Sequence, residues 1–170
     1  MTPKRRQFGV GLRWAVPTAA YFIVAVSAHY ATYPQFAVSQ VSSAACFTAG
    51  LLFIAAGVSV YLAAMVNLRT GLRSGCLVTH GLYAIMRHPL YAASILLVIP
   101  GVAIAFRSWL LLPTPMVAYV ACRAVLPAED GELLKRYGDE FVQYRKKTNA
   151  LFPMPVQWLH GRSAGAKRKA

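Results

Sequence analysis

The feature that most constrains this chain is a long apolar run, Ala44–Val66, that contains no charged side chain. About 20 mostly apolar residues in a helix are enough to cross the hydrocarbon core of a bilayer. Composition points the same way, because 57% of the residues are hydrophobic and only 14% are charged, whereas soluble domains carry about 25% charged residues. Inside lipid the main-chain polar groups must bond to one another, which a helix achieves within one segment. The chain is therefore predicted to be an all-α integral membrane protein.

Further apolar runs bring the expected number of transmembrane helices to about four. They are Trp14–Tyr33, Tyr91–Phe106 and Trp109–Leu126. Arg107 and Ser108 divide the last two, which predicts a tight helical hairpin. The third run is short and contains Pro100, so this hairpin is expected to be tilted or to cross incompletely. The first run follows a basic start, as a secretory signal does, but its length and the lack of a clear cleavage site favour a membrane helix.

The net charge of +13 is distributed along the chain as topology signals are. Basic residues gather before the first apolar run, between the second and the third, and after the fourth. Because cytoplasmic loops carry the excess of Lys and Arg, the chain is predicted to be multi-pass, with both termini on the cytoplasmic side. This distribution disfavours nucleic-acid binding. The basic tail after Pro153 is expected to lie on lipid headgroups or to be disordered in water.

All five acidic residues lie within one stretch, from Glu129 to Glu140. The same stretch, extended to Lys147, has apolar side chains three or four residues apart, which predicts an amphipathic helix. Pro127 stands where such a helix would start, and early acids interact favourably with a helix dipole. We expect this C-terminal helix to begin near Pro127 and to lie on the cytoplasmic side, against the membrane or the bundle. The apolar stripe consists of Leu133, Leu134, Tyr137, Phe141 and Tyr144.

Arg87, His88 and Pro89 adjoin the start of the third apolar run. Pro89 disfavours helical geometry at His88, so the chain is expected to bend where polar side chains meet the bilayer. Irregular backbone at such a depth must be buried in protein or line a wet cavity. Tyr83 and Tyr91 flank the bend and suit a flat or cationic ligand. A competing interpretation makes Arg87 and His88 interfacial anchors and the tyrosines part of an aromatic belt.

Several other kinds of site are disfavoured by the sequence. Gly75 and Gly81 do not form a GxGxxG motif after a strand, so a Rossmann nucleotide site is not supported. The three cysteines are scattered and form no CxxC pair, which suggests neither a structural zinc site nor a disulfide framework. His80 and His88 lack Cys or acidic ligands in their own segment, and no metal site is expected.

The segment from Leu77 to Tyr91, LVTHGLYAIMRHPLY, resembles the core motif of the isoprenylcysteine carboxyl methyltransferase family, and more broadly of the membrane phospholipid methyltransferases. A second block, EDxxLxxxYGxxFxxY from Glu129 to Tyr144, follows at the family's spacing, and a Lys-rich end with Pro153 completes it. The resemblance covers residues 75–153. It implies S-adenosylmethionine as the methyl donor, in a pocket on the cytoplasmic side that the C-terminal helix closes.

The resemblance also implies which residues hold the methyl donor. They are Gly75, Cys76, Leu77, Val78, Tyr83, His88, Pro89, Leu90, Tyr91 and Glu129. Two departures from the family pattern concern the acids and the substrate. The second acid is the shorter Asp130, and Val125 occupies the position of an arginine that contacts substrate in the eukaryotic members. Arg123 is two residues out of register, so the cofactor set is better defined than the substrate set.

The chemistry of methyl transfer suggests Arg87, His88 and Glu129 as the catalytic residues. Glu129 offers a carboxylate for the donor's ammonium group or a ribose hydroxyl, and His88 offers a hydrogen bond to the donor's carboxylate. A carboxylate acceptor is already ionised at neutral pH and needs a nearby cation, for which Arg87 is the candidate. An amine or thiol acceptor would need a proton acceptor instead, and His88 or Glu129 would serve.

The chain is thus expected to comprise membrane helices in residues 1–74, a methyltransferase core in 75–153 and a basic tail in 154–170. The favoured acceptor is the carboxylate of an isoprenylcysteine-like or other lipophilic molecule that enters from the membrane lipid. A phospholipid amine and a small thiol are alternative acceptors. Two other functions are open: an NADPH-dependent reductase of the sterol type, which has a similar Arg-His-Pro element, and a non-enzymatic membrane scaffold or transporter subunit. The last is disfavoured because the apolar runs contain few polar side chains.

Overall fold

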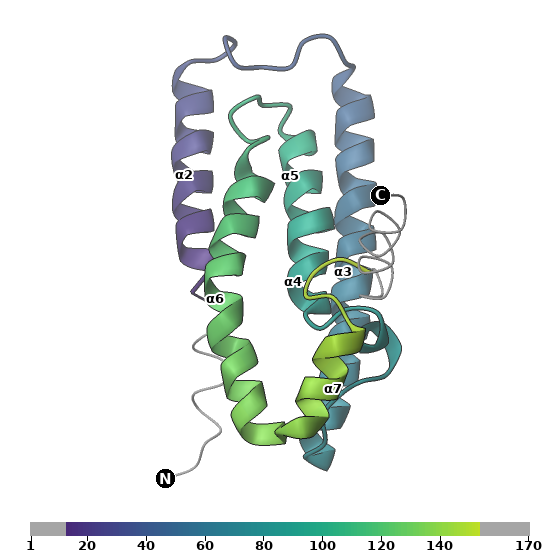
Figure 1. Cartoon of the computed structure of the whole chain (residues 1–170). Coiled ribbons are helices and arrows are strands. Elements are labelled where there is room, and N and C mark those ends of the chain that lie inside the picture. The colour runs from purple at the N-terminus through teal and green to yellow at the C-terminus, as the bar shows by residue number, and fades with distance from the viewer. Residues whose placement is uncertain (1–12, 154–170) are drawn as a thin grey trace, which may run out of the picture. The chain divides into compact units, whose positions relative to one another are not determined.

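The computed structural model describes residues 13–153, which form helices joined by turns. Within this part the only extended pairings are two isolated bridges, so the expectation of an all-helical fold is confirmed (Figure 1). The basic N-terminal residues before Arg13 and the basic tail 154–170 lie outside the described residues. The helices are α2 (Ala15–Ala31), α3 (Ser43–Ser74), the 3-10 helix η2 (Gly81–Ala84), α4 (Pro89–Ala93), the π-helix η3 (Ser94–Val98), α5 (Ile99–Ala105), α6 (Thr114–Tyr137) and α7 (Asp139–Lys147).

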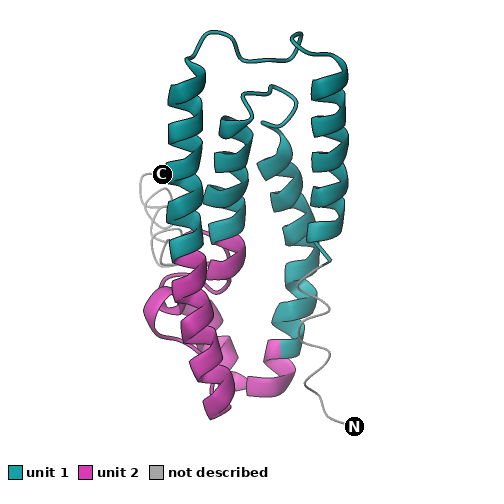
Figure 2. Cartoon of the chain, turned by 180° about the vertical axis from the view of Figure 1, so that it is seen from behind, with its two compact units in different colours: residues 1–59, 93–132 teal, residues 60–92, 133–170 magenta. Residues whose placement is uncertain are grey.

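Two compact units, each assembled from separate stretches of sequence, make up the structure. Unit 1 contains residues 1–59 and 93–132, and unit 2 contains residues 60–92 and 133–170. Figure 2 colours the two units and shows that α3 runs through both of them. Within unit 1, both views place the helices side by side in the order α2, α6, α5 and α3. The predicted division of the sequence at residue 75 stays a prediction.

The apolar run Ala44–Val66 lies within α3, which is long and apolar enough to cross a membrane. The helix starts at Ser43, one residue before the predicted Ala44, and continues to Ser74, beyond the predicted end at Val66. The extension contains Arg69 and Arg73. Hydropathy does not assign charged residues to a membrane helix, but arginine readily forms helix. The apolar helices Ala15–Ala31 and Pro89–Ala105 are shorter.

Close approach of α3 and α5 holds unit 1 together at its glycines. A Cβ atom added to Gly50 of α3 would lie 2.6 Å from the carbonyl oxygen of Gly101 on α5. One added to Gly57, two turns along α3, would lie 2.7 Å from a methyl group of Val98. Small residues of this kind let helix backbones approach closely in membranes, where packing rather than the hydrophobic effect drives association.

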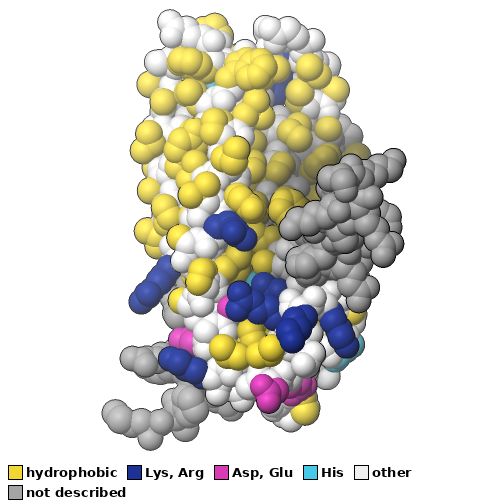
Figure 3. All heavy atoms as spheres, in the orientation of Figure 1, with side chains coloured by type: hydrophobic (Ala, Val, Ile, Leu, Met, Phe, Trp, Pro, Cys, Tyr) yellow, Lys and Arg dark blue, Asp and Glu magenta, His cyan; other side chains and the backbone are white. Residues whose placement is uncertain are grey.

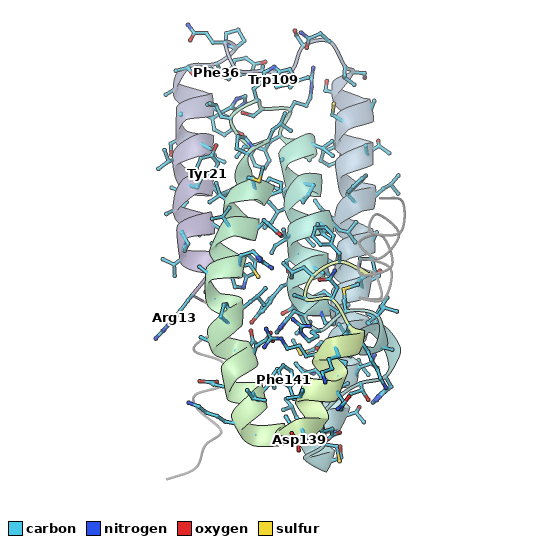
Figure 4. All side chains as sticks on the ribbon, in the orientation of Figure 1. Arg13, Tyr21, Phe36, Trp109, Asp139 and Phe141 are labelled. Atoms are coloured by element: carbon cyan, nitrogen blue, oxygen red, sulfur yellow. The ribbon has the colours of Figure 1, made fainter. Side chains whose placement is uncertain are left out.

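Helix α2 packs against the turn that joins α5 to α6. The hydroxyl of Tyr21 donates a hydrogen bond of 2.9 Å to the carbonyl oxygen of Leu110, and Figure 4 shows Tyr21 pointing from α2 toward α6. One turn further along α2, Ala25 forms a buried cluster with Ala103 of α5 and Leu111 of the turn. A residue as small as Ala25 leaves room for Leu111, which is fully buried.

Arg107 shapes the turn between α5 and α6. Its backbone is left-handed, with φ at 52°, and its Nη2 atom donates to the carbonyl oxygens of Val38 and Val41. The N–H of Trp109 bonds to the carbonyl of Phe36 at 3.0 Å, and both side chains are labelled in Figure 4. The predicted hairpin is therefore present, and its turn is fastened to the connection between α2 and α3.

One predicted helix boundary around this hairpin is wrong. The fourth helix starts at Thr114 rather than Trp109, because Pro113 accepts the first helical bonds, from Met116 and Val117. The third apolar run forms one continuous helical stretch, Pro89–Ala105, within which the π-helix η3 joins α4 to α5 just before Pro100. Proline lacks an N–H and its ring clashes with the carbonyl four residues back, and a widened turn removes that clash.

The expected start of the C-terminal amphipathic helix is also wrong. Helix α6 continues through Pro127 to Tyr137, so the stretch that begins at Glu129 is the end of α6 rather than a new helix. The break falls at Gly138, whose φ of 53° is left-handed and whose N–H bonds to the carbonyl of Leu134 at 2.8 Å. Its ψ is −128°, and residues with a Cβ atom rarely adopt this combination of angles, whereas glycine adopts it readily. Leu134 is 41% exposed, so the predicted apolar stripe does not extend over both helices.

The contact between α3 and α5 predicts opposite effects of the same substitution at two glycines. Gly50→Ala should lower the free energy of unfolding by about 1–3 kcal/mol, because overpacking forces the backbones apart. Gly131→Ala on α6 should leave stability unchanged or raise it, since its added Cβ meets nothing within 4 Å and alanine favours helix over glycine. Thermal unfolding in detergent, followed by helical circular dichroism, measures both. Equal transition temperatures for the two variants would contradict the described packing.

Candidate functional site

The segment that carries Arg87 and His88 pairs with the chain that follows α7. Within unit 2, the N–H of Arg87 bonds to the carbonyl oxygen of Asn149 at 2.8 Å, and the N–H of His88 bonds to that of Ala150 at 3.0 Å. Met86 and Asn149 form the accompanying parallel bridge. The bend predicted before Pro89 is therefore not loose, because its N–H groups are bonded to the C-terminal segment.

A buried tyrosine hydroxyl fixes the 3-10 turn η2, which precedes that bend. The hydroxyl of Tyr144 on α7 donates to the carbonyl oxygen of Tyr83 at 2.7 Å and lies 3.5 Å from that of Met86. Phe141, one turn earlier on α7, is 1% exposed and packs its ring against Tyr144 (Figure 4). The buried face of α7 thus holds η2 in place.

The side chain of Arg87 binds the C-terminal end of α7. Its Nη1 atom donates to the carbonyl oxygens of Thr148, at 2.7 Å, and Arg145, at 3.3 Å. The last carbonyls of a helix have no partner within the helix and carry its negative dipole end, so a guanidinium group is a suitable cap for them. These bonds give Arg87 a structural role that the sequence did not indicate.

His88 and Pro89 start α4 and bring an aromatic pair together. The carbonyl of His88 accepts the first helical bond, from Ala92 at 3.0 Å, which leaves Pro89 at a position where its missing N–H costs little. The imidazole of His88, which is buried, stacks on the ring of Tyr91 with centroids 5.6 Å apart and planes 10° apart. Two flat rings from the predicted cofactor set are therefore in contact.

An apolar cluster supports these residues from the side of α3. Val78, Tyr83 and Ala64 are buried together, and Leu90 packs against them. Gly81 is needed for two reasons: its φ of 60° is left-handed, and the side chain of Asn67 occupies the place of a Cβ atom. The segment between α3 and η2 thus packs closely against α3, and Val78 of this segment belongs to the cluster.

The predicted cofactor residues divide into groups with different surroundings. Tyr83, His88 and Pro89 are buried, whereas Gly75 and Cys76 are exposed just after the end of α3. The Sγ atom of Cys76 lies 3.6 Å from the carbonyl oxygen of Ser74. Leu77, Leu90 and Tyr91 are half-buried. All of these residues, with Arg87 and Val78, belong to unit 2.

Glu129 belongs to unit 1, on α6, and its side chain is half-buried. The next residue, Asp130, is only 8% exposed. Carboxylates are rarely buried to this extent unless they are paired, which makes Asp130 a candidate that the sequence reasoning did not include among the site residues. Its signal was present, because it is the second acid of the EDxxL block.

Other residues of the site were missed because they act through main-chain atoms. Thr148, Asn149 and Ala150 contribute carbonyl oxygens, for which the sequence has no signature. Tyr144 was part of the predicted stripe, but its hydrogen bond to Tyr83 was not foreseen. Asn67 could have been noticed as a polar residue that extends an apolar helix.

Basic side chains gather on the last turn of α7. Arg145, Lys146 and Lys147 form its last turn, and Asp139 and Glu140 its first, an arrangement that complements the helix dipole. Figure 3 shows Lys and Arg side chains over α7, whereas hydrophobic side chains dominate the visible face of unit 1. These exposed charges stabilise α7.

No family model matches the chain, and no curated protein matches it at a significant level of similarity. The resemblance to the methyltransferase family therefore stays a prediction that depends on the two sequence blocks.

Removing the Tyr144 hydroxyl should loosen the bend without unfolding the protein. In Tyr144→Phe the buried carbonyl of Tyr83 loses the hydrogen bond from the Tyr144 hydroxyl, at a cost of about 1–3 kcal/mol. Hydrogen exchange at the Arg87 and His88 amides, measured by mass spectrometry, should accelerate by tenfold or more. Tyr137→Phe is the matched control, since no hydrogen bond of the Tyr137 hydroxyl occurs among the described residues. If both variants exchange at the rate of the parent protein, the bond does not hold the bend.

Proposed function

We propose that this protein is an S-adenosylmethionine-dependent membrane methyltransferase that acts on a lipophilic acceptor, with a carboxylate acceptor of the isoprenylcysteine type favoured. The observation that carries the proposal is the meeting of the two sequence blocks. Tyr144, from the second block, donates to Tyr83 of the first, and Arg87 binds the carbonyls at the end of α7. Two blocks that a family resemblance pairs, and that are joined by specific hydrogen bonds, support a shared site.

The residues offered have the chemistry that this methyl donor requires. It carries a sulfonium, an ammonium group, a carboxylate and an adenosine, and when bound it supplies an electrophilic methyl group. The stacked rings of His88 and Tyr91 suit a cation or a flat base. We assign the ammonium group or a ribose hydroxyl to Glu129 on α6, on the strength of the EDxxL block, with Asp130 as a second carboxylate.

The same residues have distinct tasks toward the acceptor. The bend at His88 fixes the imidazole beside Tyr91, and such positioning is the main contribution that a protein makes to an in-line displacement. For a carboxylate acceptor no base is needed. For an amine or thiol acceptor, His88 or Glu129 takes the proton. Arg87 faces two demands, because the guanidinium that we proposed to balance a carboxylate already binds the carbonyls of Thr148 and Arg145.

We further propose a multi-pass arrangement with the site and both termini on the cytoplasmic side. The length and apolar character of α3 support at least one crossing. The basic residues Arg69, Arg73 and Arg87 follow the apolar part of α3, and Arg145 to Lys147 follow α6. This is the side on which the positive-inside rule places them.

Binding of the methyl donor tests the proposal directly. Protein purified in detergent or nanodiscs should bind S-adenosylmethionine and its demethylated product, measured by calorimetry. Glu129→Gln should weaken binding by about 10–100-fold, the effect of losing a hydrogen bond to a charged group. Glu140→Gln, which removes an exposed acid from α7, is the matched control and should bind normally.

Two results would overturn the assignment. Unchanged affinity in Glu129→Gln would remove that carboxylate from the pocket. Binding of NADPH with no binding of the methyl donor would identify a reductase instead.

Arg87 variants separate a charge effect from a positioning effect. If the guanidinium mainly holds α7, Arg87→Lys should lower turnover and also accelerate amide exchange in residues 144–150, because one amine cannot bind both carbonyls in the same geometry. If it mainly balances the acceptor's charge, Arg87→Lys should retain most of its turnover and leave exchange unchanged, while Arg87→Ala raises KM for a carboxylate acceptor. Normal turnover and exchange in Arg87→Ala would exclude both roles.

A further inference from the structure

The charges of α7 are divided between its two ends. Asp139 and Glu140 stand in the first turn, and Arg145, Lys146 and Lys147 form the last. All five side chains are exposed. The nine residues of the helix make it about 13 Å long, which exceeds the screening length of about 8 Å at physiological salt. A ligand at the last turn therefore meets three cations and little of the field of the two acids.

The last turn of α7 lies beside the start of an apolar helix. The segment that follows it accepts hydrogen bonds from the N–H groups of Arg87 and His88, and the Arg87 side chain donates to the carbonyl of Arg145 within the last turn. The apolar stretch Pro89–Ala105 begins directly after this bend. The basic end of α7 is thus the end next to the apolar helix, and the acidic end, where Figure 4 labels Asp139, is the far end.

The same level of unit 2 is where the apolar run of α3 ends. Leu90, next to the bend, packs against a cluster that includes Ala64 of α3. Val66 is 63% exposed, and the first charged residue of the helix, Arg69, follows it and is also exposed. In the proposed membrane arrangement the exposed Val66 faces lipid. Arg69 and the last turn of α7 then lie at the depth of the lipid headgroups.

The inner face of α7 is occupied by packing inside unit 2. Phe141, Tyr144 and Thr148 are buried, and their spacing of three and four residues puts them on one face. The three basic side chains therefore spread over the outer part of the last turn. The sequence of unit 2 contains no acidic residue other than Asp139 and Glu140. The outer surface at this end of α7 is consequently positive.

We propose that the last turn of α7, together with Arg69, docks on anionic phospholipid headgroups of the membrane that α3 crosses. Charge complementarity selects an anionic partner, and the position beside two apolar helices selects a lipid rather than a soluble anion. Each basic side chain near an anionic bilayer strengthens such an association by about fivefold. The inference rests on the proposed membrane arrangement and is independent of methyl transfer.

Docking also acts on the candidate site. Arg87 binds the carbonyl oxygens of Arg145 and Thr148 at the end of α7, and Tyr144 of the same helix holds η2. A lipid that fixes the last turn of α7 therefore also fixes the bend at His88. Anionic lipid is thus expected to order the segment that contains most of the predicted cofactor residues.

Hydrogen exchange in nanodiscs of two lipid compositions tests the docking. The full chain is reconstituted in phosphatidylcholine alone and in phosphatidylcholine with about 30% phosphatidylglycerol, which gives an anionic surface. Exchange of the amides of residues 144–150 is followed by mass spectrometry. It should be about tenfold slower with phosphatidylglycerol, because docking opposes local opening. Salt at about 1 M should remove the difference.

Two double variants separate a local contact from general charge attraction. Lys146→Gln with Lys147→Gln removes two of the three cations of the last turn and should lose most of the response to phosphatidylglycerol. Lys135→Gln with Arg136→Gln is the matched control. It removes the same charge from exposed positions at the end of α6, next to the acidic end of α7, and should respond as the parent protein does.

Equal exchange of the parent protein in the two lipids would overturn the inference, and that comparison needs no variant. A response that persists without Lys146 and Lys147, or one that both double variants lose equally, would overturn it as well. Failure of the chain to enter nanodiscs of either composition would overturn the membrane arrangement and the docking together. Binding of S-adenosylmethionine is measured separately, so its failure would affect the methyltransferase proposal alone.

Discussion

Main-chain carbonyl groups that a regular helix would leave without donors are the constraint on which this structure depends. Each long-range side-chain hydrogen bond described within a unit ends on such an oxygen. Tyr21 donates to Leu110, Arg107 to Val38 and Val41, Arg87 to Thr148 and Arg145, and Tyr144 to Tyr83. In an apolar environment an unpaired carbonyl costs more than in water. These tyrosine and arginine side chains therefore hold irregular backbone in place at several of the connections between helices.

The two units use this device for different purposes. In unit 1 the arginine turn and Tyr21 close the connections between helices, and glycines bring α3 and α5 together. In unit 2 the same chemistry holds a functional candidate, because the bend at His88 is bonded to the segment after α7.

The sequence was sufficient to predict the helices but not their ends. Hydropathy located α2 and most of α3, because the long apolar runs permit little else. It missed the extension of α3 through Arg69 and Arg73, since charged residues form helix as readily as apolar ones. It placed a boundary at Pro127, whereas the helix tolerates that proline and stops at Gly138, whose left-handed φ is visible only in the structure. Within the candidate site, His88, Pro89 and Tyr91 were identifiable from their motif. The carbonyls of residues 148–150 were not, because a main-chain acceptor has no side-chain signature.

The glycine contact between α3 and α5 limits where a lipophilic molecule could enter unit 1. With a carbonyl of one helix almost touching the backbone of the other at Gly50 and Gly101, the seam is too narrow for an acyl or prenyl chain. A hydrophobic molecule therefore cannot enter unit 1 between α3 and α5. The lipophilic acceptor that we propose would have to enter between a different pair of helices, so the glycines that bring α3 and α5 together also restrict its direction of entry.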